Sequence, residues 1–123
     1  MLSSASYQRS KAEDRLDLVF RALADPTRRA LLGSLARGPA KVTDLAEPFK
    51  MSLPAVSKHL KVLERAGLLV RAVDGRVHRC SLSAEPLWEA EQWLSSYRPF
   101  WEQTLDALAR YVEEDKNKRD GGR

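Results

Sequence analysis

Residues 52–66 read SLPAVSKHLKVLERA, a helix pattern with two different faces. If the helix starts after residue 52, its 3.6-residue period places Val56, Leu60 and Leu63 on one apolar side. The opposite side is small and cationic and comprises Pro54, Ser57, Lys58, Lys61 and Arg65. No acidic residue lies on that side, and a helix needs such a face if it is to approach phosphates and base edges in a DNA groove. The stretch therefore predicts a helix that packs by one face and reads a groove with the other.

The segments on either side complete a DNA-binding unit. Residues 42–50 read as a short helix capped by Thr43, and a tight connection leads from it into the central helix. Two helices across such a turn form a helix-turn-helix, whose second member enters the major groove. Residues 68–73 and 76–82 then flank Asp74-Gly75, which is the strongest short signal for a β-hairpin. A helix-turn-helix followed by a basic hairpin predicts a winged helix, a mainly α fold with a small β-hairpin.

Helix boundaries are marked by residues suited to each end. Ser52 is a good N-cap for the central helix, and Gly67 stands where a C′ glycine would end it. Asp25 predicts the cap of an earlier helix that has Pro26 at its first position and Gly38 beyond its end.

Three stretches follow one another in a fixed order: LADPTRR at residues 23–29, VSKHLKVL at residues 56–63 with AGL at 66–68, and DGR at 74–76. In this order and spacing they resemble the ArsR-type winged-helix transcriptional repressors, and the resemblance covers roughly residues 15–113. Residues 93–101, WLSSYRPFW, resemble a branch of that family without the metal-ligand sets. The resemblance implies a DNA-binding repressor; repression itself is not visible in the residues.

Length and composition indicate one ordinary globular domain. The chain has 123 residues, with 43% hydrophobic and 31% charged residues, and no apolar run approaches the length of a membrane span. We expect no membrane partner, because the N-terminus also lacks the apolar segment of a signal peptide. A single cysteine excludes an internal disulfide and fits the reducing cytoplasm.

An enzyme has little support. The chain is short for a catalytic cleft, and it has no Gly-rich phosphate loop, paired-acid signal or cofactor motif. Ser57 and His59 lie two residues apart on one helix, so they cannot face each other as nucleophile and base. We predict no catalytic activity and no cofactor.

Charge is distributed unevenly along the chain. Residues 50–82 hold 7 Lys and Arg against 2 Asp and Glu, a net charge of +5, whereas residues 83–115 hold 2 against 8, a net charge of −6. The basic excess coincides with the central helix and the hairpin, where a polyanion would lie. The acidic segment should face away from DNA.

The expected domain runs over residues 13–114, between a disordered arm of residues 1–12 and a flexible tail of residues 115–123. Within it, residues 14–24 read as the first helix. Arg28 and Arg29 in the next helix are expected to be solvated, although either could touch a phosphate.

Residues 86–114 form the second organising element. Apolar residues recur there in steps of three and four over four heptads, which predicts a long helix with a seam. We expect this seam to join two copies into a homodimer, because large apolar stripes on small domains usually cover a partner. The expected interface residues are Leu87, Ala90, Leu94, Tyr97, Trp101 and Leu108. Pro99 should kink the helix or split it near Arg98.

Metal binding is not expected. In the ArsR family, arsenic sensors carry a cysteine pair in the helix before the recognition helix, where this chain has TDLAE at residues 43–47. Zinc sensors of the family place histidines on the last helix, and residues 86–114 contain none. His78 and Cys80 share one face of a hairpin strand, but two ligands do not complete a tetrahedral site.

The remaining thiol and histidine have structural interpretations. Antiparallel pairing about Asp74-Gly75 puts Cys80 opposite Leu69, so we predict a small buried hydrophobe, with a redox-sensing thiol as the alternative. We expect His59 to be a hydrogen-bonded structural residue.

The sequence thus predicts a homodimeric winged-helix regulator bound to a palindromic operator in double-stranded DNA. Phosphate contacts are assigned to Lys58, Lys61, Arg76 and Arg79. Base contacts are assigned to Leu53, Pro54 and Ser57, and Lys58 could also hydrogen-bond a guanine. Thr43 and Ser52 complete the expected DNA-binding set.

Two alternatives come from other classes. In the first, an unknown effector or a redox change gates the protein from a site at the aromatic dimer helices, near Trp93, Tyr97, Phe100 and Trp101. In the second, the winged helix docks a protein and never touches DNA. The +5 segment argues against the second, because a protein-docking hairpin has no need of clustered cations.

Overall fold

The first two helices begin at side-chain caps. The computed structural model describes residues 10–121, and α1 (Lys11–Leu23) begins where the Ser10 hydroxyl accepts a hydrogen bond from the Glu13 N–H at 3.1 Å. This start is three residues earlier than expected and lies inside the predicted arm, whose residues 1–9 fall outside the described residues. The cap predicted at Asp25 is confirmed, because its carboxylate accepts from the Arg28 N–H at 3.0 Å at the start of α2 (Pro26–Leu35).

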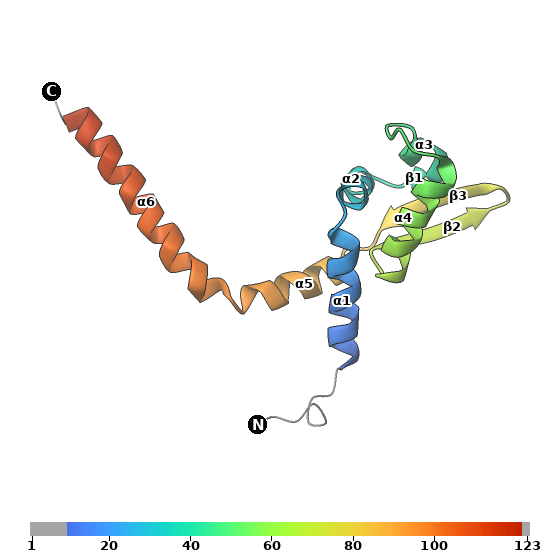
Figure 1. The fold of residues 1–123 in the computed structure, drawn as a ribbon, viewed down its shortest axis with the longest axis horizontal. Helices are drawn as coiled ribbons and strands as arrows, with labels where there is room; N and C mark the ends of the chain where they lie inside the picture. The colour runs from blue at the N-terminus through green and yellow to red at the C-terminus, as the bar shows by residue number, and fades with distance from the viewer. Residues whose placement is uncertain (1–9, 122–123) are drawn as a thin grey trace. The chain divides into compact units, whose positions relative to one another are not determined.

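The helix-turn-helix consists of α3 (Val42–Ala46) and α4 (Leu53–Arg65), shown with the rest of the fold in Figure 1. The predicted cap at Thr43 is wrong. The chain passes directly from a short strand, β1 (Ala40–Lys41), into α3, so Lys41 occupies the cap position and makes no side-chain cap bond. The cap predicted at Ser52 is confirmed, since its hydroxyl accepts from the Ala55 N–H at 3.3 Å.

The end of α4 is a glycine turn. Gly67 has φ +77°, its N–H donates to the Glu64 carbonyl at 2.9 Å, and the Leu68 N–H donates to the Leu63 carbonyl at 3.0 Å. These two bonds form a Schellman motif, so the prediction of a C′ glycine at this position is confirmed. The turn delivers the chain into the hairpin, which we call the wing: β2 (Leu69–Asp74) and β3 (Val77–Leu82).

The sheet is antiparallel in the order β1-β3-β2. Its register differs from the prediction, because Asp74 pairs with Val77 and the turn residues are therefore Gly75 and Arg76. Gly75 has φ +61° and Arg76 has no positive φ, which are the φ signs of a type II′ turn with glycine first. Cys80 consequently lies opposite Arg71 and not Leu69. The shift is two residues, so Cys80 stays on the predicted face and is buried at 0% exposure.

The core lies beneath α4. Val56, Leu60 and Leu63 are fully buried and pack with the inner faces of α1, α2 and the wing. A buried alanine, Ala90, joins this core from α5 (Glu85–Ser95), and Leu87 packs against it half-buried. The two-faced helix predicted from residues 52–66 is therefore confirmed on its apolar side.

The predicted C-terminal seam is divided between two helices, α5 and α6 (Arg98–Gly121). Pro99 was predicted to kink the helix or split it near Arg98, and the structure shows a split. The N–H groups of Ser96 and Tyr97 make turn bonds, and Pro99 stands in the first turn of α6, where its missing N–H is not needed. The flexible tail expected from residue 115 is instead helical as far as Gly121, with an Asp115–Arg119 ion pair at 3.0 Å.

The chain divides into two compact units after Ala90, and α6 lies wholly within the second. No helix among residues 10–121 is long and apolar enough to cross a membrane.

Candidate nucleic-acid interface

The outer face of α4 is open to solvent along its length. Lys58, Lys61 and Arg65 are exposed, and Ser57 is half-buried between them and the core stripe. At the start of the helix Pro54 is exposed, and the Leu53 side chain keeps 46% of its surface accessible. An exposed leucine beside short and cationic side chains is suited to packing on a base edge rather than to the core.

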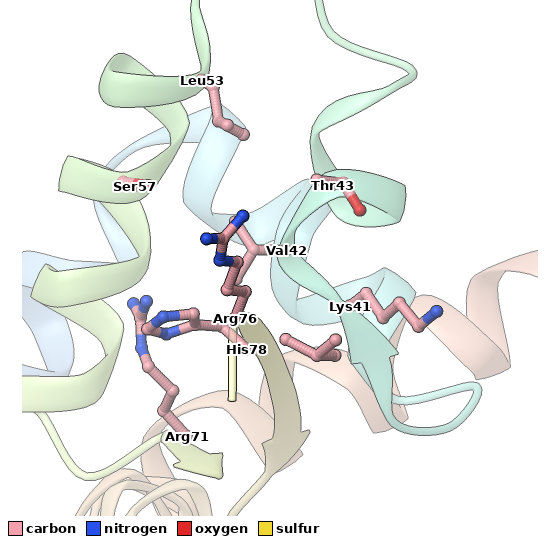
Figure 2. Close-up of a pocket in the computed structure, with 9 residues that line it drawn as sticks. Lys41, Val42, Thr43, Leu53, Ser57, Arg71, Arg76 and His78 are labelled. Atoms are coloured by element: carbon pink, nitrogen blue, oxygen red, sulfur yellow. The ribbon is translucent and has the colours of Figure 1, made fainter. Parts of the chain in front are cut away.

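A pocket of ≈ 440 Å³ lies between α3, α4 and the wing. We call it the wing pocket. Figure 2 shows it lined from three elements, with Thr43 on α3, Ser57 on α4 and Arg76 and His78 on the wing. The full lining is Lys41, Val42, Thr43, Leu53, Ser57, Arg71, Arg76, Val77 and His78. It contains three Lys or Arg residues, two hydroxyls and no carboxylate, so the wing pocket is suited to an anion.

Four of the predicted DNA-binding residues line the pocket, and the others lie outside its lining. Thr43, Leu53, Ser57 and Arg76 line it together. Lys58, Lys61 and Pro54 belong to the exposed surface of α4 outside the lining, and Ser52 is engaged in its cap. Arg79 is exposed on β3 opposite Lys41 of β1, away from the pocket lining.

Sequence reasoning missed three basic or titratable side chains in this region. His78 has a predicted role only in an incomplete pair of metal ligands, and Arg71 and Lys41 have no predicted role. Arg71 is the most buried of them, with 15% of its side chain exposed and its Nε 3.8 Å from the Glu64 carboxylate. Its Nε and Nη2 are buried without a hydrogen-bond partner. The alternation of side chains along β2 could have placed Arg71 on the same face as Leu69. It could not have predicted the pocket neighbours of Arg71, because they come from other elements.

Lys41 and Arg79 are direct cross-strand partners on β1 and β3, and both are exposed. Like charges opposite each other destabilise a strand pair. Neither cation makes an ion pair within residues 10–121. These two cations thus add to the unneutralised positive charge beside α4.

Arg28 and Arg29 were expected to be solvated; Arg29 is exposed, whereas Arg28 is half-buried. The Arg28 guanidinium donates from Nε to the Ala22 carbonyl at 2.7 Å and from Nη2 to the Arg21 carbonyl at 2.8 Å. Arg29 donates from Nη1 to the Leu23 carbonyl at 2.7 Å. Both arginines therefore bind carbonyl groups at the end of α1.

His59 lies beside Arg28 and Asp25, as a structural histidine should. Its Nδ1 is 3.3 Å from the Arg28 Nη1 and 3.8 Å from the Asp25 Oδ2. The hydrogen bond from the Arg28 backbone N–H, followed by the charge of the Arg28 guanidinium, lowers the pKa of Asp25 below its ordinary value of 3.8. Asp25 thus remains a carboxylate at neutral pH.

Among the residues that the structure describes, no group of three or more His, Cys, Asp and Glu side chains could hold a metal ion. Burial raises the pKa of the Cys80 thiol, which keeps it protonated and unreactive. The interpretation of Cys80 as a small buried hydrophobe is confirmed.

The expected dimer residues have different environments. Ala90 is 5% exposed within the core of its own chain, so it drops out of the expected interface, and Leu87 also packs on that core. The other four are exposed and form what we call the apolar strip: Leu94 (44%), Tyr97 (45%), Trp101 (39%) and Leu108 (54%). The aromatic rings beside the strip pack on one another, with Trp93 and Tyr97 edge to face at 5.1 Å.

Comparisons with known proteins agree with this geometry. Residues 25–70 match the family described as "Bacterial regulatory protein, arsR family". The chain is 34% identical over 79 residues to the transcriptional repressor SdpR of Bacillus subtilis, covering 64% of this chain and 88% of that protein. It is 36% identical over 99 residues to the HTH-type transcriptional regulator Rv2034 of Mycobacterium tuberculosis, covering 80% and 90%. A crystal structure of an ArsR family transcriptional regulator, RHA00566, superposes with a TM-score of 0.70 at 45% identity, covering 76% of this chain and 97% of that one.

Proposed function

Because this chain belongs to the ArsR family and is a DNA-binding transcriptional regulator rather than an enzyme, we propose that it represses transcription as a homodimer on a palindromic operator. The observation that carries the proposal is the cationic face of α4 next to the acid-free wing pocket. The name of the repressor SdpR supports repression. The protein acts where the DNA is, in the cytoplasm.

In the proposed complex, α4 lies in the major groove and the wing lies over the backbone. Leu53, Pro54 and Ser57 read base edges at the start of the helix, and Lys58 reaches a guanine or a neighbouring phosphate. Phosphates are neutralised by Lys61, Arg76 and Arg79, with Thr43 and Ser52 at their margin. The lining of the wing pocket extends this set to Lys41 and Arg71, with His78 beside them.

The dimer is supported by the apolar strip. A chain of 123 residues that leaves Leu94, Tyr97, Trp101 and Leu108 exposed has a surface suited to a second copy of itself. Two copies are also what a palindromic operator requires, because each half-site takes one recognition helix.

The assembly is tested by sedimentation equilibrium at micromolar concentration. We expect a dimer for the wild type and a 13.9 kDa monomer with weakened operator binding for Leu94→Glu or Trp101→Glu. Gln103→Glu adds the same charge on α6 outside the heptad seam and should remain dimeric. A wild-type protein that sediments only as a monomer contradicts the homodimer.

The DNA contacts are tested on an operator obtained by selecting bound DNA from random sequence. Affinities for operator and scrambled DNA are then measured across a salt series. Lys61→Ala and Arg76→Ala should weaken both DNAs alike and reduce the log–log salt slope by about 1, because each removes a phosphate contact. Ser57→Ala should change the preferred bases at one position, by about 1–3 kcal/mol, and leave the slope unchanged.

Arg110→Ala is the matched control, because it removes an exposed cation from α6 and should leave both affinity and slope near wild type. A wild-type protein with no preference for any selected DNA would contradict the proposal. A changed base preference for Arg76→Ala would show that the wing reads sequence.

A further inference from the structure

Arg28 connects the end of α1 to the recognition helix α4. Two of its donors are fixed on the Ala22 and Arg21 carbonyls, and the third, Nη1, is 3.3 Å from the Nδ1 of His59 on α4. We infer that Arg28 and His59 form a positioning pair that sets the rotation of α4 about its axis, with His59 accepting the Arg28 hydrogen bond at Nδ1. The inference rests on the proposed role of α4 as the DNA-reading helix.

The orientation of Arg28 is fixed by contacts that do not involve α4. The Arg28 guanidinium binds two of the last carbonyls of α1 at 2.7 and 2.8 Å, and the second of these, that of Arg21, also accepts from the Ala24 N–H at 3.3 Å. A guanidinium is planar, so two fixed nitrogens also fix the direction of the third. The Arg28 backbone N–H is held as well, by the Asp25 carboxylate at 3.0 Å. Arg28 therefore offers α4 a donor in one defined direction.

The chemistry of the pair determines the tautomer of His59. An arginine can only donate, so the Nδ1 of His59 must be the acceptor and its proton must be on Nε2. Asp25 Oδ2 lies 3.8 Å from the same Nδ1, beyond hydrogen-bond distance. A proton on Nδ1 would remove the acceptor for Arg28 and point a donor at Asp25 instead. The arrangement therefore requires the Nε2–H tautomer of His59.

Another directional contact of α4 is the long Glu64–Arg71 ion pair to β2, at 3.8 Å. Val56, Leu60 and Leu63 hold it by apolar burial, which opposes separation but depends only weakly on direction. His59 is on the flank between that buried stripe and the Ser57–Lys58 face, with 20% of its side chain exposed. A rotation of about 20° would move a side chain roughly 5 Å from the helix axis by about 1.7 Å. That displacement is enough to break a hydrogen bond to a base edge.

The test compares two near-isosteric replacements of His59. In His59→Asn the amide oxygen takes the place of Nδ1, whereas in His59→Gln the amide group takes the place of Nε2. We expect His59→Asn to bind the operator within about twofold of wild type and His59→Gln to lose about three- to tenfold, the contribution of one hydrogen bond. Helix propensity alone predicts the opposite order, because glutamine is the better helix former.

Arginine variants supply the matched control. Arg28→Lys keeps the charge but loses the planar guanidinium with its fixed donor directions, so it should lose about as much operator affinity as His59→Gln. The double variant should bind no more weakly than either single variant. Arg29→Lys makes the same chemical change at a residue that also binds a carbonyl of α1, with no hydrogen bond to α4. It should bind DNA like the wild type.

A second measurement does not depend on DNA or on the stability of a variant. The imidazole ¹⁵N shifts of His59 in the wild-type protein should report an Nε2–H tautomer with an unprotonated Nδ1. Equal operator affinities for His59→Asn and His59→Gln, or an Nδ1–H tautomer, would overturn the positioning pair while the proposed function stands. A wild-type protein that binds no DNA would overturn both.

Discussion

Gly67 joins the recognition helix to the wing, and replacing it with alanine should destabilise the fold in two separable ways. The residue has φ +77°, a left-handed conformation that side chains with a Cβ avoid. A Cβ built on Gly67 would also lie 3.3 Å from the Cγ of Pro86, at the start of α5. Gly75 in the wing turn has a similar φ of +61° but nothing within 4 Å of a built Cβ.

The comparison of these two glycines gives the magnitude. A sparsely populated backbone conformation costs a non-glycine residue about 1–3 kcal/mol, and Gly75→Ala, at the first position of a type II′ turn, should lose that amount alone. Gly67→Ala should lose about 1–2 kcal/mol for its left-handed conformation and about 1 kcal/mol more, the low end of overpacking, because Pro86 must move by a few tenths of an ångström. Gly33, in α2, also has nothing within 4 Å of its built Cβ and no positive φ, so Gly33→Ala should stabilise the protein by about 1 kcal/mol.

The assay is urea denaturation of all three variants at one protein concentration, because association contributes to the stability of a dimer. We expect the free energy of unfolding to rank Gly33→Ala above wild type, and Gly75→Ala and Gly67→Ala both below it. A loss of only about 1 kcal/mol for Gly67→Ala would refute the contact with Pro86. No loss for Gly67→Ala would refute the left-handed turn at the end of α4.

Three further predictions concern the caps and the thiol. Ser52→Ala should cost about 1 kcal/mol of unfolding free energy, measured from melting curves, because it removes the cap. Ser52→Asp should keep the cap and the stability. It should still weaken DNA binding, measured from binding curves, because it adds a negative charge beside the phosphates. The pKa of Asp25 is lower in the folded protein than its ordinary 3.8, so its carboxylate stabilises the fold above that pH. The stability difference between wild type and Asp25→Asn should therefore shrink as pH falls below 3.8 in denaturation series. Cys80, buried with a raised thiol pKa, should react with a thiol reagent only at the rate of unfolding, and rapid stoichiometric labelling of the native protein would favour the redox-sensing alternative.

Local signals in the sequence predicted the parts of the fold that depend on neighbouring residues. A cap such as Ser52 or Asp25 binds an N–H three residues away, so its chemistry is visible in a short window. The same holds for Gly67, where the backbone must turn, and for Pro99, which cannot donate inside a helix. The apolar period of α4 predicted its buried face for the same reason.

The parts that were missed depend on partners far along the chain. Asp74-Gly75 is compatible with more than one turn, and only the pairing of β2 with β3 decides that Gly75 comes first. β1 exists because two residues pair with β3, about 40 positions away, and that pairing removes the cap expected at Thr43. Arg28 likewise finds His59 31 residues away, so its position gave no sign of a role beyond α2.

The opposed cations of β1 and β3 give salt two opposite effects on this protein. Without DNA, Lys41 and Arg79 repel each other across the strand pair, so added salt should screen them and stabilise the free domain. In the proposed complex, phosphates neutralise the same two charges, so added salt should weaken DNA binding. A buffer that maximises the melting temperature of the purified protein is therefore a poor one in which to look for its operator. Short polyanions at low salt should instead raise the melting temperature, because they bind the two repelling cations, whereas salt only screens the repulsion.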